Sequence, residues 1–128
     1  MLCAVMRRVL VSVTALAALL LTACGDKSDL PAGESASVKR GAELFSQRCF
    51  GCHTLDTVGA EGGASNVRDR ERVDGPNFNV RKETDDNVLY AIRNGGYSGG
   101  IMPENIVVGK DADMVAAFLA KYSGRKSK

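Results

Sequence analysis

The chain has 128 residues, of which 45% are hydrophobic and 25% are charged, with a formal net charge of +2 at pH 7. This length allows one small domain, and such a balanced charge gives no indication of binding to nucleic acid. The sequence contains four cysteines and a single histidine, which limits the metal and redox chemistry open to the domain.

The N-terminal region has the layout of an export signal. Arg7 and Arg8 precede an apolar run that ends in small residues, as in a secretory signal peptide, which we assign to residues 1–23. An uncleaved membrane helix is the alternative, but the run from Val9 to Ala23 has 15 residues and a spanning helix needs about 20. All 15 acidic residues follow this segment, so its removal leaves equal numbers of basic and acidic side chains.

The end of this signal, Leu21-Thr22-Ala23-Cys24, resembles the lipobox of bacterial lipoproteins. The resemblance implies that the Cys24 sulfur carries diacylglycerol and that the exported protein is held on a membrane, at the outer face of the cytoplasmic membrane or the periplasmic side. An ordinary cleavage that leaves a cysteine is the alternative. Residues 24–37 then comprise the lipidated cysteine and a segment rich in Gly, Ser, Ala and Pro, which predicts a flexible tether.

The folded domain is expected over residues 38–123, followed by a basic tail at 124–128. The first helix is predicted over 38–50, because Val38, Ala42, Phe45 and Cys49 fall on one face. We predict all-α architecture with three main helices, since no alternating strand pattern appears.

The second helix is predicted to start at Thr84, a good N-cap, and to stop at Asn94-Gly95-Gly96. The third is predicted over about 111–122, with Asp111 as its N-cap. Residues 54–80 lack a sustained period and are predicted to be loop. Within that loop, the alternating charges of 68–74 indicate a solvated excursion with at most one helical turn.

The chemistry of the domain centres on Cys49-Phe50-Gly51-Cys52-His53, a Cys-x-x-Cys-His motif for covalent attachment of haem. Two thiols at this spacing reach the two vinyl groups of one porphyrin, and His53 then ligates the iron. A zinc site is disfavoured because it needs about four protein ligands. A thioredoxin-type redox pair is disfavoured because the βαβ context that it expects is missing. A structural disulfide remains an alternative.

A second axial ligand must come from elsewhere, because His53 is the only histidine. Met114 falls at helical spacing among apolar residues, which favours core packing. Met102 lies in a Gly-rich loop before Pro103 and is the predicted axial ligand; simple packing of Met102 against the haem is the alternative. Ligation by His and Met closes both axial positions, which favours electron transfer over catalysis.

The region from Val38 to Tyr122 resembles the class I (monohaem) cytochrome c family, as a small bacterial lipoprotein-type member. The resemblance implies the small cytochrome c fold, with three main helices and loops wrapped around one covalently bound haem c per chain. It further implies that the Pro76 carbonyl bonds the free ring nitrogen of His53 and that Asn105 bonds the Met102 sulfur. Gly41 and Phe45 are expected to pack on Val115 and Phe118.

We therefore expect a monomeric, membrane-anchored one-electron carrier of a respiratory chain, not an enzyme, working between a quinol-oxidising complex and a terminal oxidase or reductase. An electron-accepting subunit of an exported dehydrogenase and a haem gas or redox sensor are the alternatives. Arg81 and Arg93 are candidate partners of the haem propionates. With charges balanced, partner recognition is expected to use an apolar patch around the haem edge.

Overall fold

The computed structural model describes residues 28–64, 66–97 and 101–126. The expected signal peptide (1–23), Cys24 and the beginning of the tether lie outside these ranges, as do the last two residues of the tail. The elements in chain order are α2 (Ala36–Arg48), β1 (Thr54–Leu55), η2 (Asp56–Val58), β2 (Ala60–Glu61), η3 (Val67–Asp69), α3 (Asp85–Asn94) and α4 (Gly109–Tyr122). None of the helices described is both long enough and apolar enough to cross a membrane.

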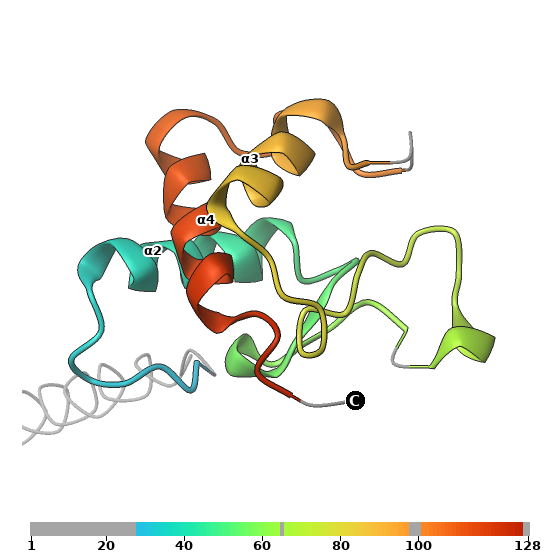
Figure 1. Ribbon diagram of the computed structural model, residues 1–128, viewed down its shortest axis with the longest axis horizontal. Helices are drawn as coiled ribbons and strands as arrows, with labels where there is room; N and C mark the ends of the chain where they lie inside the picture. Colours follow the sequence, from blue (N-terminus) through green and yellow to red (C-terminus); the bar gives the residue numbers. More distant parts are fainter. Residues whose placement is uncertain (1–27, 65, 98–100, 127–128) are drawn as a thin grey trace, which may run out of the picture.

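The three long helices confirm the all-α prediction, and α4 packs against both α2 and α3 (Figure 1). The crossing of α2 and α4 is close at Gly41, where an added Cβ would overlap the carbonyl of Met114 and lie 2.9 Å from Phe118 Cβ. Beside it, the rings of Phe45 and Phe118 are 5.8 Å apart between centroids. Both rings are fully buried, so the expected pairing of these two helices is confirmed.

Helix α3 has the predicted bounds because both of its ends are fixed by local chemistry. The Thr84 side chain accepts a hydrogen bond from the backbone N–H of Asn87 at 3.3 Å. Gly95 ends the helix with a φ of +66°, a left-handed conformation that glycine adopts without steric cost. Val88 and Ile92 are buried on the face toward the core.

The other two helices begin earlier than predicted. Helix α2 starts at Ala36 because the Ser35 hydroxyl caps it, accepting from the N–H of Val38 at 3.3 Å. Helix α4 starts at Gly109, so the prediction that Asp111 is its N-cap is wrong. Asp111 lies in the first turn instead, where its carboxylate stabilises the positive end of the helix dipole.

The loop after α2 contains a two-stranded antiparallel sheet, in which β1 pairs with β2. Each strand has two residues, too few for an alternating pattern in the sequence. A parallel bridge joins Thr54 to Asn77, and the N–H of Phe78 donates to the Thr54 carbonyl at 2.8 Å. These bonds hold the chain just after His53 against the Gly75-Pro76-Asn77 segment.

The described part of the expected tether contacts the domain rather than extending freely from it. Leu30 packs against the core, and the N–H of Asp29 donates to the carbonyl of Thr57 at 2.8 Å. Glu34 accepts a hydrogen bond from Lys121 Nζ at 2.7 Å and another from the hydroxyl of Tyr122. These partners lie at the end of α4, so local sequence composition gave no indication of the contact.

Candidate haem-binding cleft

The Cys-x-x-Cys-His motif forms a tight turn at the C-terminus of α2. The N–H of Cys49 still donates to the helical carbonyl of Phe45 at 2.8 Å, and the N–H groups of Cys52 and His53 donate back to the Cys49 carbonyl at 3.2 and 3.1 Å. Neither sulfur is paired in a disulfide. Burial, with a smaller effect from Cys52, raises the pKa of Cys49 to about 12 and keeps it protonated at neutral pH.

His53 is held in one orientation by contacts on several sides. Its Nδ1 lies 3.3 Å from the Pro76 carbonyl oxygen, and its ring stacks on Phe78 with centroids 4.8 Å apart and planes 14° apart. A Cβ on Gly75 would lie 2.5 Å from Nδ1 and 2.8 Å from Nε2, so only glycine permits this approach.

The protonation of His53 follows from the same surroundings. Burial lowers the pKa of His53, the hydrogen bond with Pro76 opposes that effect, and the charge of Arg81 lowers it further. The neutral ring then donates from Nδ1 to Pro76, which leaves Nε2 with a free lone pair. A neutral imidazole with its second nitrogen engaged in this way is the form that ligates metals.

Next to His53 lies a cleft of about 280 Å³ that receives residues from all three helices and from the loops after α2 and α3. Its lining includes Cys49, Cys52, Met102 and an apolar interior that contains Phe45, Ile92 and Leu119. The cleft therefore places two thiols, one imidazole and one thioether around a single apolar space. Its lip carries Tyr97 and Ile101, both more than half exposed.

The two methionines differ in position, and Met114 does not belong to the core cluster that was predicted for it. Met102 lines the cleft and is half-buried against the core, whereas Met114 on α4 is not part of the lining. Asn105 is exposed, and no hydrogen bond joins its side chain to Met102 within the residues described. Its backbone N–H donates to the Ile92 carbonyl at 2.7 Å, and its φ of +53° is one that asparagine tolerates better than most residues.

Charged side chains surround the apolar interior of the cleft. Four arginines and two carboxylates contribute to the lining, namely Arg48, Arg70, Arg72, Arg81, Asp74 and Glu83. Arg93 does not contribute. The resulting excess of positive charge suits a flat apolar ligand with two carboxylates, and the thiols, imidazole and thioether suit its metal and vinyl groups. The residues present therefore fit haem c.

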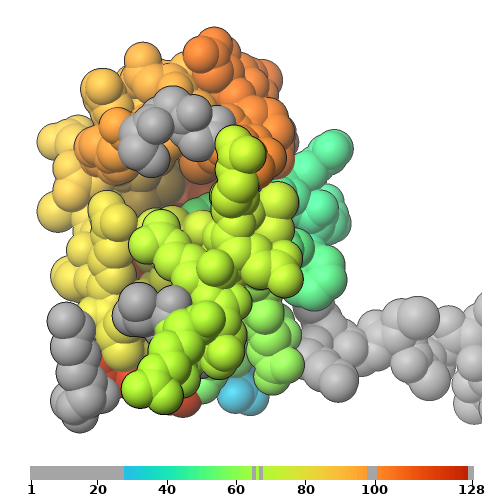
Figure 2. All heavy atoms as spheres, turned by 90° about the vertical axis from the view of Figure 1, so that its right-hand side faces the viewer, coloured from blue at the N-terminus to red at the C-terminus, as the bar shows by residue number. Residues whose placement is uncertain are grey.

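Sequence reasoning missed two features of this cleft. Residues 68–74 were expected to be a solvated excursion, and η3 is the single turn predicted there, yet Arg70 and Arg72 reach the cleft lining. In Figure 1 this segment projects to the right of the domain. Figure 2 views the molecule from that side and shows the segment in front of the body of the domain. Glu83 was not singled out because it precedes the N-cap of α3, where an acidic residue is unremarkable in sequence.

Fold and site together define a small c-type cytochrome: three helices around an apolar cleft with the Cys-x-x-Cys-His turn on its wall. The model of the family described as "Cytochrome C oxidase, cbb3-type, subunit III" matches residues 36–119. Cytochrome c-551 of Bacillus subtilis (strain 168) is 30% identical over 109 residues, which cover 80% of this chain and 84% of that protein.

The chain belongs to the class I monohaem cytochrome c family. It binds haem c covalently and is an exported electron-transfer protein rather than an enzyme. These findings agree with the sequence-based expectations for cofactor, fold and reaction class.

Proposed function

We propose that this chain carries single electrons on a haem attached through Cys49 and Cys52, with His53 and Met102 as axial ligands. The observation that supports it most is the presence of all four side chains on one apolar cleft, with His53 oriented by the Pro76 carbonyl. When bound, the haem iron supplies the one-electron exchange. The protein contributes by fixing His53, excluding water from the apolar interior and closing the second axial position with Met102.

The axial assignment is tested by replacing each methionine. Met102→Ala is expected to abolish the thioether–iron charge-transfer band of the oxidised protein and to allow carbon monoxide to bind the reduced form. Met114→Ala, the matched control on α4, keeps the band. Retention of the band in Met102→Ala contradicts the assignment. Rapid carbon monoxide binding to the unmodified protein at neutral pH supports the alternative of a haem sensor.

We also propose that Cys24 carries a lipid anchor that holds the protein on a membrane. The support is the Leu21-Thr22-Ala23-Cys24 sequence, which resembles a lipobox, and the exported class of the protein. Cys24→Ala is expected to release a soluble cytochrome or to stop signal processing, whereas Cys3→Ala leaves the protein in the membrane fraction. A correctly processed Cys24→Ala protein that stays in the membrane fraction contradicts the proposal.

The proposed pathway runs from a quinol-oxidising complex to a terminal oxidase or reductase. The matching family model is named for a subunit of a cbb3-type oxidase, which favours an oxidase as the electron acceptor. An electron-accepting subunit of an exported dehydrogenase remains the second candidate. Purification of the detergent-solubilised protein under mild conditions separates the two, because the expected co-purifying complex contains an oxidase and not a dehydrogenase.

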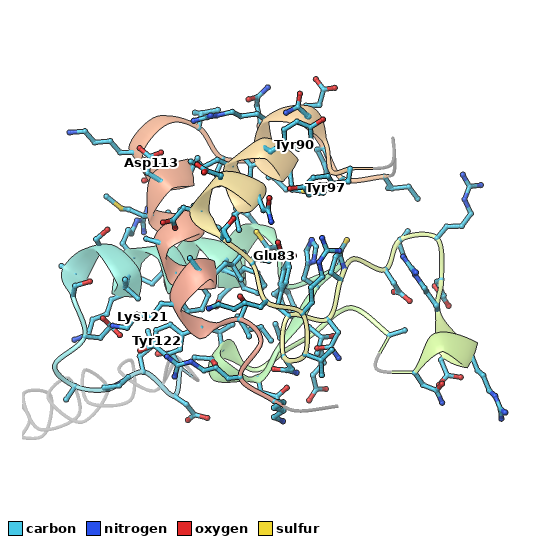
Figure 3. The ribbon with its side chains drawn as sticks, viewed as in Figure 1. Glu83, Tyr90, Tyr97, Asp113, Lys121 and Tyr122 are labelled. Carbon is cyan, nitrogen blue, oxygen red and sulfur yellow. The ribbon has the colours of Figure 1, made fainter. Side chains whose placement is uncertain are left out.

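The partner is expected to approach at the lip of the cleft that carries Tyr97 and Ile101. The ring of Tyr97 stacks on that of Tyr90 with centroids 5.0 Å apart, and both side chains are more than half exposed (Figure 3). Ile101, which is also more than half exposed, lines the same cleft as Tyr97. Exposed apolar side chains at the edge of the cleft fit the short-lived, partly apolar contacts of redox partners.

A further inference from the structure

The side chains of Glu34 and Glu83 are almost fully covered, and only Glu34 has an evident structural role. Glu34 joins the N-terminal segment to the end of α4. Glu83 is 5% exposed and faces the cleft. A buried charge is costly unless it is paired, so its retention beside an apolar cofactor site calls for an explanation.

The position of Glu83 is fixed by its backbone. Its N–H donates to the hydroxyl of Ser123 at 2.9 Å, and Ser123 itself is buried after the end of α4. The N–H of Gly124 donates to the Phe78 carbonyl at 2.7 Å, so the segment before α3 is tied to α4 at two points. Figure 3 shows Glu83 near the centre of the molecule, whereas Asp113 and Lys121 lie at its periphery.

The partner of Glu83 is Arg81, whose Nε lies 2.5 Å from Glu83 Oε1. Arg81 also lines the cleft, with about half of its side chain exposed. His53, the proposed iron ligand, lines the same cleft. A positive and a negative charge therefore lie together on the wall of the cleft that also carries the proposed iron ligand.

We propose that Glu83 offsets the charge of Arg81 at the haem and thereby sets the reduction potential. This inference rests on the proposed ligation by His53. The oxidised centre carries one more positive charge than the reduced centre, so an uncompensated cation on the cleft wall favours reduction. The cleft wall excludes most water at Glu83, so the effect of the Glu83 charge on the haem is screened much less than the effect of a surface charge.

The experiment measures the midpoint potential by spectroelectrochemistry in Glu83→Gln, which keeps an oxygen that can accept from Arg81 Nε. The equilibrium constant for reduction is expected to rise about tenfold, equivalent to 59 mV for a one-electron couple. The double variant Arg81→Gln/Glu83→Gln removes both charges and is expected to return close to the wild-type potential. The control is Glu43→Gln on α2, whose partner Arg40 lies at 3.0 Å and which is absent from the cleft lining.

A Glu83→Gln potential equal to that of Glu43→Gln overturns the inference, as does a double variant that keeps the full shift of the single one. If Glu83→Gln fails to take up haem, Arg81→Gln instead leaves the buried Glu83 carboxylate uncompensated on the same wall. Its potential is expected to fall, and an unchanged value contradicts the inference. Absence of the thioether–iron charge-transfer band from the oxidised wild-type protein would instead count against the proposed axial ligands, whatever the midpoint potentials of the variants.

Discussion

The replacement Gly75→Ala tests how His53 is positioned. An alanine Cβ would lie 2.5 Å from His53 Nδ1 and 2.8 Å from Nε2, well inside van der Waals contact. The ring cannot move away freely, because Phe78 stacks on it and Pro76 holds Nδ1. Such overpacking costs about 1–3 kcal/mol, which exceeds the roughly 0.4–1 kcal/mol that alanine gains through the unfolded chain.

For a domain of this size each kcal/mol lowers Tm by about 4–8 °C, so the loss is readily measured. The assay is thermal unfolding of the haem-loaded protein, followed by circular dichroism, with the oxidised spectrum recorded in parallel. Gly51→Ala is the matched control, since a Cβ there meets no atom within 4 Å. If Gly75→Ala melts at or above the temperature of Gly51→Ala, contact between residue 75 and His53 does not position the ring.

Two further predictions concern charged residues. Hydrogen bonds from Lys121, Tyr122 and the Ser35 N–H lower the pKa of Glu34 from 4.5 to about 2. Because the folded-state pKa is depressed, this stabilisation is present above pH 4.5 and is lost as the pH falls toward 2. Denaturant unfolding between pH 6 and pH 2 is therefore expected to show a smaller loss of stability in Glu34→Gln than in the wild type; parallel curves would contradict this. Arg70→Gln/Arg72→Gln is expected to slow oxidation by ferricyanide severalfold at low ionic strength, with the rates converging at high salt. Arg68→Gln, on the same segment but outside the cleft lining, is the control, and an equal effect there would show that position at the cleft is irrelevant.

The sequence predicts those features that depend on neighbouring residues. Helix α3 has the expected bounds because Thr84 and Gly95 act on the residues beside them. The motif at Cys49 to His53 is equally local, since one helical end and one turn bring its side chains together. The start of α4 was missed because Val108 provides no side-chain cap, which removes the signal on which such a prediction depends.

Features that depend on distant residues were not predictable in this way. The partners of Glu34 are 87 and 88 positions away, and Glu83 is bonded to Ser123, 40 positions away. Nothing near these residues in the sequence distinguishes them from surface acids. The same holds for Arg70 and Arg72, whose alternating charges indicate exposure and give no sign of the cleft beside them.

The docked N-terminal segment changes the geometry expected for a membrane-anchored carrier. A flexible tether over 25–37 would span roughly 20 Å as a random coil and let the domain turn freely. With contacts already formed at Asp29 and Leu30, four peptide links from Cys24 to residue 28 remain, at most about 14 Å when extended. In Figure 1, the described N-terminal segment (blue) runs along the lower side of the domain, whereas the 68–74 segment beside the cleft projects to the right. A lipid on Cys24 would therefore hold the lower side toward the membrane and leave the cleft open to partners approaching along its surface.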